Sequence, residues 1–259
     1  MTTKTIGFVG GGRVTRIILE ALNRAQPGPA HTVVSDPNPS ALAKLQERFP
    51  QITSTPGDNA RAAGQEIVFL AVHPPALGEV AGQIKDALRP DAIVISLAPK
   101  FTLARLSALL GGFQRIVRVI PNAPSMLGLG FNPIAFGAAL SPVDRAAVNS
   151  LLAPLGECPE VDETKLEGYA LLTAMGPTYL WFQLQTLREL AVEFGLTEAE
   201  VAPALKRMVC GSTRTLLESG LSATEVMDLV PVKPLGDLEA GLIEAYRSRL
   251  GAVHQKLKP

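Results

Sequence analysis

The stretch that decides the fold runs Ile6-Gly7-Phe8-Val9-Gly10-Gly11-Gly12-Arg13-Val14-Thr15. An apolar run typical of a strand leads through three glycines into a helical pattern. Gly10 permits a tight turn, and Gly12 lets the backbone approach a pyrophosphate with no Cβ in the way. The third small position of this fingerprint falls on Thr15, and we expect that departure to loosen the contact between helix and strand. The segment predicts a dinucleotide-binding turn; a glycine turn with a purely structural role is the alternative.

Apolar runs and amphipathic stretches alternate through the part of the chain that follows. Continuous apolar runs suit strands that are covered on both faces, as in a parallel sheet between two layers of helices. The alternation therefore predicts a doubly wound, mostly parallel α/β domain of the Rossmann type. The predicted strands are residues 5–9, 32–35, 66–72, 92–97 and 116–120, and the predicted helices include residues 40–49 and 77–88.

The pattern becomes helical after about Pro159. A long helical stretch over residues 166–194 is interrupted near Gly176-Pro177, and capping boxes begin new helices at Thr197 and Ser222. Residues 237–257 form a final helix. We predict two domains, a dinucleotide-binding domain over residues 1–158 and an all-α domain over residues 159–259.

Composition bounds the function. Of the 259 residues, 47% are hydrophobic, and 24 Lys plus Arg balance 24 Asp plus Glu, which gives no reason to expect nucleic acid or an acidic membrane surface as a partner. The two cysteines, Cys158 and Cys210, form no disulfide framework and no metal pattern. The N-terminal residues lack a secretory pattern, and no apolar run is long enough to cross a bilayer. We expect a cytoplasmic protein without a metal site.

The end of the second predicted strand bears on the choice of cofactor. An acidic residue there accepts hydrogen bonds from the ribose hydroxyls and repels a 2′-phosphate. Asp36 stands at about this place, and a turn residue before Pro37 is the alternative. No arginine lies beside it, although Arg13 could reach over from the first turn. The pattern favours NAD without excluding NADP.

Several further segments resemble one family, the pyrroline-5-carboxylate reductases. Residues 118–124, Arg-Val-Ile-Pro-Asn-Ala-Pro, closely resemble the family's Arg-x-Met-Pro-Asn-Thr-Pro segment. Residues 69–74 resemble the end of its fourth strand, and residues 176–179 resemble the Gly-Pro-Ala-Tyr that opens its dimerisation helix. The resemblance implies an NAD(P)H-dependent reductase that transfers hydride to a cyclic imine in proline biosynthesis. It also implies a homodimer or higher homo-oligomer. Trp181 and Phe182 sit at helical spacing within an apolar stripe, which favours a place in the dimer or domain core over a stacking platform.

The resemblance also indicates which residues contact the cofactor and a small-molecule substrate. Asn122 would supply a polar group at the nicotinamide end; an Asx turn between two prolines is the alternative. The predicted cofactor contacts are Gly10, Gly11, Gly12, Arg13, Val14, Asp36, Ala71, Val72, Pro74, Ala98 and Asn122.

Three residues are candidate catalytic groups, each with a structural alternative. His73 could act as an acid near the nicotinamide ring, and the alternative is a partly exposed loop histidine. Thr178 could donate a proton or hydrogen bond to substrate, and the alternative is a helix cap. Glu163 falls where the family has an acidic residue near the substrate amine, and the alternative is an exposed carboxylate at a helix start.

The segments that would hold the substrate depart from the family pattern. The loop Ser-Pro-Gly-Gly-Thr-Thr, which holds the substrate carboxylate in the family, is replaced by residues 230–237. Met175 cannot donate a hydrogen bond to an anion, and residues 98–100, Ala-Pro-Lys, replace Ala-Ala-Gly. The departures indicate a different small imine or carbonyl substrate. The alternatives are a deazaflavin-linked nicotinamide oxidoreductase and a non-catalytic homologue that binds the cofactor.

Overall fold

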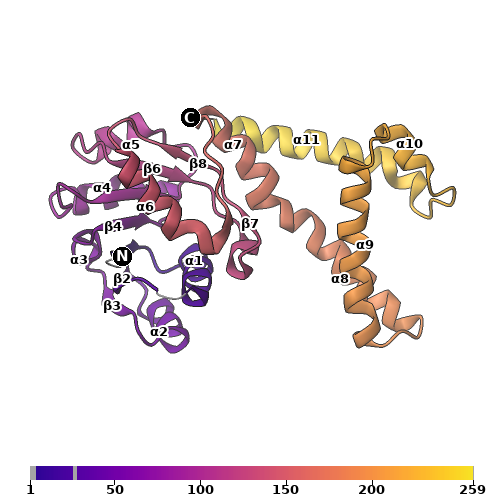
Figure 1. The fold of residues 1–259 in the computed structure, drawn as a ribbon, viewed down its shortest axis with the longest axis horizontal. Coiled ribbons are helices and arrows are strands. Elements are labelled where there is room, and N and C mark those ends of the chain that lie inside the picture. Colours follow the sequence, from indigo (N-terminus) through magenta and orange to yellow (C-terminus); the bar gives the residue numbers. More distant parts are fainter. Residues whose placement is uncertain (1–3, 26–27, 259) are drawn as a thin grey trace. The chain divides into compact units, whose positions relative to one another are not determined.

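The computed structural model describes residues 4–25 and 28–258 (Figure 1). They form two compact units, which are described separately. The first contains the described residues up to Met175 and those from His254 onward, and the second is Gly176–Val253. The division of function between residues 1–158 and 159–259 remains a proposal.

The first unit is built on a seven-stranded sheet in the order β3-β2-β1-β4-β5-β6-β8. All neighbouring strands are parallel except β8, which runs antiparallel to β6. This confirms the predicted doubly wound Rossmann sheet, although β3 and β8 were not predicted. The strands are β1 Thr5–Val9, β2 His31–Asp36, β3 Thr53–Pro56, β4 Ile67–Leu70, β5 Ile93–Ser96, β6 Ile116–Val119 and β8 Ile134–Phe136, and β7 Gly130–Phe131 pairs separately with β9 Gly156–Glu157.

Helices cover both faces of the sheet because neighbouring strand residues point to opposite faces. Phe8 of β1 packs with one group of helices, and Val9 packs with the other. In the first core, Phe8 stacks on Phe69 of β4 with ring centroids 4.6 Å apart. The first group is α1 Arg13–Arg24, α2 Pro39–Arg48 and α6 Pro142–Leu152, and the second is α3 Asn59–Ala63, α4 Leu77–Ile84 and α5 Leu103–Leu109.

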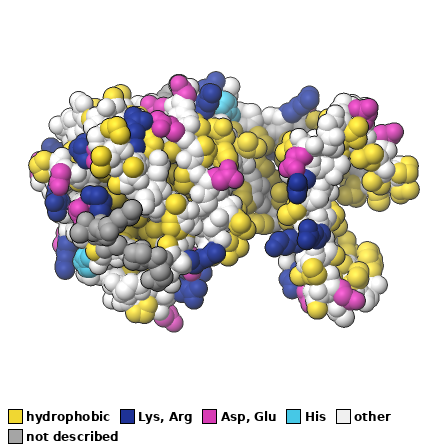
Figure 2. Space-filling view, viewed as in Figure 1, with side chains coloured by type: hydrophobic (Ala, Val, Ile, Leu, Met, Phe, Trp, Pro, Cys, Tyr) yellow, Lys and Arg dark blue, Asp and Glu magenta, His cyan; other side chains and the backbone are white. Residues whose placement is uncertain are grey.

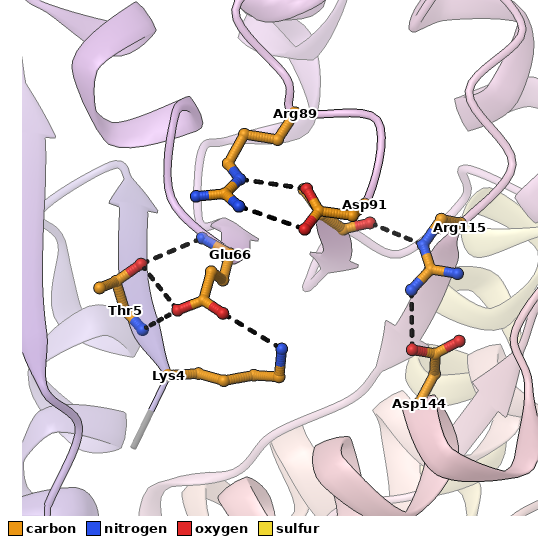
Figure 3. A network of polar contacts seen from close by, with 8 residues as sticks. Lys4, Thr5, Glu66, Arg89, Asp91, Arg115 and Asp144 are labelled. Carbon is orange, nitrogen blue, oxygen red and sulfur yellow. Dashed lines mark hydrogen bonds and ion pairs between the residues drawn. The ribbon is translucent and has the colours of Figure 1, made fainter. Parts of the chain in front are cut away.

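Polar contacts tie the strands together at their first residues (Figure 3). The Glu66 carboxylate accepts a hydrogen bond of 2.8 Å from the backbone N–H of Thr5, which joins β4 to β1. That hydrogen bond outweighs burial and lowers the pKa of Glu66. Arg115 donates to the carbonyl of Ala92 at 3.2 Å and to Asp144 of α6 at 2.7 Å. The amino ends of the central strands are therefore held in register by side chains as well as by the ladder.

The predicted interruption of the long helical stretch takes the form of a π-helical segment. The helix α7, Leu166–Tyr169, passes into π-helix over Ala170–Met175, and α8 follows as Gly176–Glu193. Pro177 has no N–H to donate to the preceding turn, so a regular α-helical ladder cannot continue through this position.

The second unit consists of helices whose ends match the predicted signals. Glu200 accepts a hydrogen bond of 2.8 Å from the Thr197 N–H, and Glu225 does the same for Ser222 at 2.8 Å. Gly195 adopts φ +97° just after α8. The other helices are α9 Glu198–Glu218, α10 Ala223–Asp228 and α11 Glu239–Leu257, whose last residues belong to the first unit.

Among the described residues, no helix combines the length and the apolar character needed to span a membrane.

Candidate functional site

A cavity of about 510 Å³ lies where β1, β4, β5 and β6 end. The strand order reverses between β1 and β4, so the loops that follow these two strands diverge and leave a crevice. The carboxyl ends of parallel strands at such a point are the usual ligand site of open α/β sheets. The predicted site residues that line the cavity are Gly12, Arg13, Val14, Ala71, Val72, His73, Pro74 and Ala98.

The glycine turn after β1 has two distinct requirements for glycine. Gly10 adopts φ +107°, and a Cβ there would lie 2.4 Å from the carbonyl oxygen of Ala71, so the protein's own packing excludes any side chain. At Gly12, by contrast, no heavy atom of the described residues other than Gly12 and its two sequence neighbours lies within 4 Å of the position that a Cβ would take. Packing within the chain does not require this glycine. A diphosphate group close to the backbone would require it, and the open space at Gly12 fits such a group.

The first turn of α1 is arranged to receive an anion. Gly12 is the N-cap residue, no side chain of the described residues caps it, and the turn contains no acidic residue. The N–H groups of this first turn and the positive end of the helix dipole are therefore available to an anion. Arg13 is exposed at the first helical position and adds a positive charge. Together these features fit the pyrophosphate of a dinucleotide.

Thr15 is bonded to the glycine turn, and the expected loosening of the contact between α1 and β1 remains a prediction. The residue is fully buried, and its hydroxyl donates a hydrogen bond of 2.5 Å to the carbonyl oxygen of Gly10. The hydroxyl thus supplies a polar link in place of the close packing that a glycine or alanine would give. The turn is held to the helix that follows it.

Asp36 has the turn role that the sequence left open, and its contact with a ribose remains a prediction. One carboxylate oxygen accepts a hydrogen bond of 2.8 Å from the N–H of Asn38, as in an Asx turn. The other accepts a hydrogen bond of 2.8 Å from the N–H of Gly11. The end of β2 is therefore bonded directly to the glycine turn, and a partly exposed carboxylate stands beside it.

Asn122 is buried and bonded within its own loop. Its amide oxygen accepts a hydrogen bond of 3.0 Å from the Ser125 hydroxyl, and its amide nitrogen donates to the carbonyl of Phe131 at 3.4 Å. The cavity wall at this point is formed by Ile120 and Pro121. A contact between Asn122 and the nicotinamide remains a prediction.

The three candidate catalytic residues lie in different places. His73 is exposed, precedes a 3₁₀ helix at Pro74–Ala76 and lines the cavity. Glu163 is only partly exposed, and it accepts hydrogen bonds from Arg118 at 2.9 Å and from the N–H of Leu103 at 2.6 Å. Thr178 lies in α8, within the second unit, so its role toward the cavity remains a prediction.

A buried ion pair beside the cavity was not predicted. Arg118 of β6 is 1% exposed and lies 2.6 Å from the carboxylate of Glu167, which is also buried. Glu167 in turn accepts a hydrogen bond of 3.2 Å from the N–H of Lys100, a non-glycine residue with φ +72°. The network therefore fixes the loop that carries Pro99, a residue of the cavity wall. The available signal was a charged residue inside the apolar run of residues 116–120.

Some cavity residues were absent from the predicted site. Leu97 and Ile120 end predicted strands, so the rule that ligands bind at carboxyl ends would have found them. Ala170 and Ala174 come from the π-helical segment. No sequence pattern marked them, because π and α segments have similar compositions. Met175, identified above as a departure from the family, also lines the cavity.

Comparisons with known proteins agree with this geometry. The family model described as "NADP oxidoreductase coenzyme F420-dependent" matches residues 5–100. The pyrroline-5-carboxylate reductase of Escherichia coli strain K12 is 29% identical over 234 residues, which cover 88% of this chain and 84% of that protein. The solved structure of a pyrroline-5-carboxylate reductase from Coxiella burnetii is 26% identical, with a TM-score of 0.70, over 99% of this chain and 95% of that one. The Plasmodium falciparum enzyme with NADP bound has the same fold, with a TM-score of 0.74 at 20% identity and the same coverage.

Proposed function

We propose that this chain, a relative of the pyrroline-5-carboxylate reductases, is an NAD(P)H-dependent reductase that transfers hydride to a small cyclic imine or carbonyl compound. The observation that carries the proposal is the cavity at the strand ends, bordered by a glycine turn that leaves open space at Gly12. Reduced nicotinamide supplies the hydride when it is bound, and the protein supplies position and electrostatics.

The residues of the cavity divide this work. The N–H groups at the start of α1 hold the pyrophosphate, and Asp36 accepts from the adjacent ribose. Ala98, Ile120 and Pro121 form an apolar wall that excludes water from the nicotinamide end. We assign His73, which lines the cavity, to donate a proton to the nitrogen or oxygen of the substrate as the carbon receives hydride.

The substrate that we propose differs from the one named for the relatives. The cavity wall carries Ala174 and Met175, and neither side chain can donate a hydrogen bond to a carboxylate. Residues 230–237 also lack the hydroxyl pair of the family loop. We therefore expect slower turnover of pyrroline-5-carboxylate than of at least one cyclic imine or carbonyl compound without a carboxylate at that position.

The proposal is tested by cofactor binding and cofactor oxidation. Calorimetry should show saturable binding of NADH or NADPH, and absorbance should report its oxidation with pyrroline-5-carboxylate or with members of a panel of cyclic imines and keto acids. Binding without turnover of any compound would leave a non-catalytic homologue. Absence of binding would refute the proposal.

A variant at Gly12 separates cofactor binding from folding. Gly12→Val fills space that no described residue occupies, so the thermal midpoint should stay within a few degrees while cofactor affinity falls by at least about tenfold. Gly82→Val is the matched control, because Gly82 also has no neighbour within 4 Å but lies in α4. Equal affinities in the two variants would contradict the assigned turn.

The proposal extends to assembly and location. The helical unit leaves many large apolar side chains exposed, which supports a homodimer or higher homo-oligomer that covers them. Residues 1–158 would then bind the cofactor, and residues 159–259 would contribute the contact between subunits. We place the protein in the cytoplasm on the basis of its composition.

A further inference from the structure

We infer that Asp36 makes this protein select NADH over NADPH. The inference rests on the proposed function, because it concerns the ribose that adjoins the pyrophosphate site. NADPH differs from NADH by a phosphate on the 2′-hydroxyl of that ribose, so a group that faces this hydroxyl decides between the two cofactors.

The position of Asp36 is fixed by the sheet and by the glycine turn. It ends β2, which pairs with β1, and the carbonyl of the preceding Ser35 accepts a hydrogen bond of 2.8 Å from the N–H of Gly10. A Cβ at Gly11 would lie 3.2 Å from the Cβ of Asp36, so the side chain packs directly against the turn. A ribose that adjoins a pyrophosphate at Gly12 must therefore pass this carboxylate.

The orientation of the carboxylate is also fixed. Its two oxygens accept one hydrogen bond each, from the N–H groups of Gly11 and Asn38. An ionised carboxylate offers about four acceptor positions, so lone pairs remain for ribose hydroxyls. The group can accept from a 2′-hydroxyl, and it offers nothing that a 2′-phosphate could bind.

The charged residues near Asp36 in the sequence do not neutralise its negative charge. Residues 37–43, which follow β2, contain no Lys or Arg. The next cation is the exposed Lys44 within α2, and Arg48 at the end of α2 is paired with Glu20 at 3.0 Å. The loop after β3 adds Asp58, whose carboxylate caps α3. Arg13 is the cation of the cavity lining, and its place is at the start of α1, where the pyrophosphate charge is expected. A 2′-phosphate at this position would therefore meet the carboxylate of Asp36.

The experiment is a titration of the full chain with each reduced cofactor, in which calorimetry or nicotinamide fluorescence measures the binding. We expect NADH to bind at least about tenfold more tightly than NADPH, because two like charges in contact at a protein surface repel strongly. Asp36→Asn removes the charge and keeps one acceptor oxygen, and should lower this affinity ratio at least about fivefold. Because Asp36 also holds the turn, the ratio is the readout, since a weakened turn affects both cofactors alike.

Asp91→Asn is the matched control. It removes the same charge from a residue paired with Arg89 just before β5, at the amino end of the sheet, and should leave the ratio unchanged (Figure 3). Equal or tighter binding of NADPH by the natural chain, or an unchanged ratio in Asp36→Asn, would overturn the inference and leave the proposed function intact. Failure to bind either cofactor would instead overturn the proposed function.

Discussion

At the scale of single residues, Lys100 carries backbone strain next to the cavity. Its φ of +72° lies in the left-handed region, which costs a residue with a Cβ roughly 1–2 kcal/mol. Lys100→Gly removes this cost but also makes the unfolded chain more flexible, which offsets about 0.4–1 kcal/mol. We predict a net gain of about 0.5 kcal/mol in the free energy of unfolding, measured by urea denaturation.

Lys100→Ala is the control for this prediction. It removes the charged side chain but keeps the Cβ, so the strain remains and the free energy of unfolding should not rise. A gain of equal size in both variants would show that the lysine side chain, and not the backbone conformation, is responsible.

Single residues also show how far the sequence alone could lead. The sequence placed Gly10, Gly12 and Asp36 in or beside the turn after β1, because the strand, turn and helix around them follow from local patterns. Arg118 and its partner Glu167 were not predicted, because 49 residues separate them and only the tertiary fold brings them together. Asn122 was predicted as a cofactor contact, but its hydrogen bond to the carbonyl of Phe131, which belongs to another element, was not predicted.

At the scale of elements, the Arg118–Glu167 pair anchors α7 to β6. Arg118→Met would leave the Glu167 carboxylate buried without its cation, and we predict a loss of about 3–5 kcal/mol in the free energy of unfolding. The double variant Arg118→Met, Glu167→Leu should recover most of this loss, because neither charge is then buried.

Arg188→Met provides the comparison with an exposed pair. Arg188 and Glu198 are bonded at 2.8 Å but are largely solvent-accessible, so the change should cost less than about 1 kcal/mol. If Arg118→Met lowered the free energy of unfolding by no more than Arg188→Met does, the buried pair would not be what anchors α7 to β6.

Elements were predictable where the local pattern was strong. The apolar runs located β1, β2, β4, β5 and β6, and the capping boxes located the starts of α9 and α10. The strand β3 was missed because Thr53–Pro56 is polar and ends in proline, and it is a strand only because it pairs with β2. The strand β8 is three residues long, and its pairing with β6 defines it.

At the scale of the whole molecule, the helical unit exposes more apolar surface than a single copy tolerates well. Phe182, Phe194 and Leu217 are 66%, 77% and 74% exposed, and yellow side chains are visible over this unit in Figure 2. We predict that a second copy covers part of this surface. Sedimentation velocity should therefore give at least twice the 27.4 kDa of one chain.

The variant Phe182→Glu tests whether the exposed apolar surface of α8 is the surface through which two copies associate. A charge in an apolar contact should weaken self-association by at least about tenfold, whereas Gln185→Glu, a change at another exposed residue of the same helix, should have little effect. A monomer at all concentrations of the natural chain would refute the predicted assembly.

The polar ties among Thr5, Glu66, Ala92 and Arg115 have a consequence for how this scaffold can change. They set the alignment of the central strands from the edge farthest from the cavity, so the loops over the cavity are not needed to align the sheet. Cavity residues that make no packing contact within the described chain, such as Gly12, can therefore change with little effect on folding. A scaffold of this kind can acquire a new specificity at one rim while the other preserves its architecture.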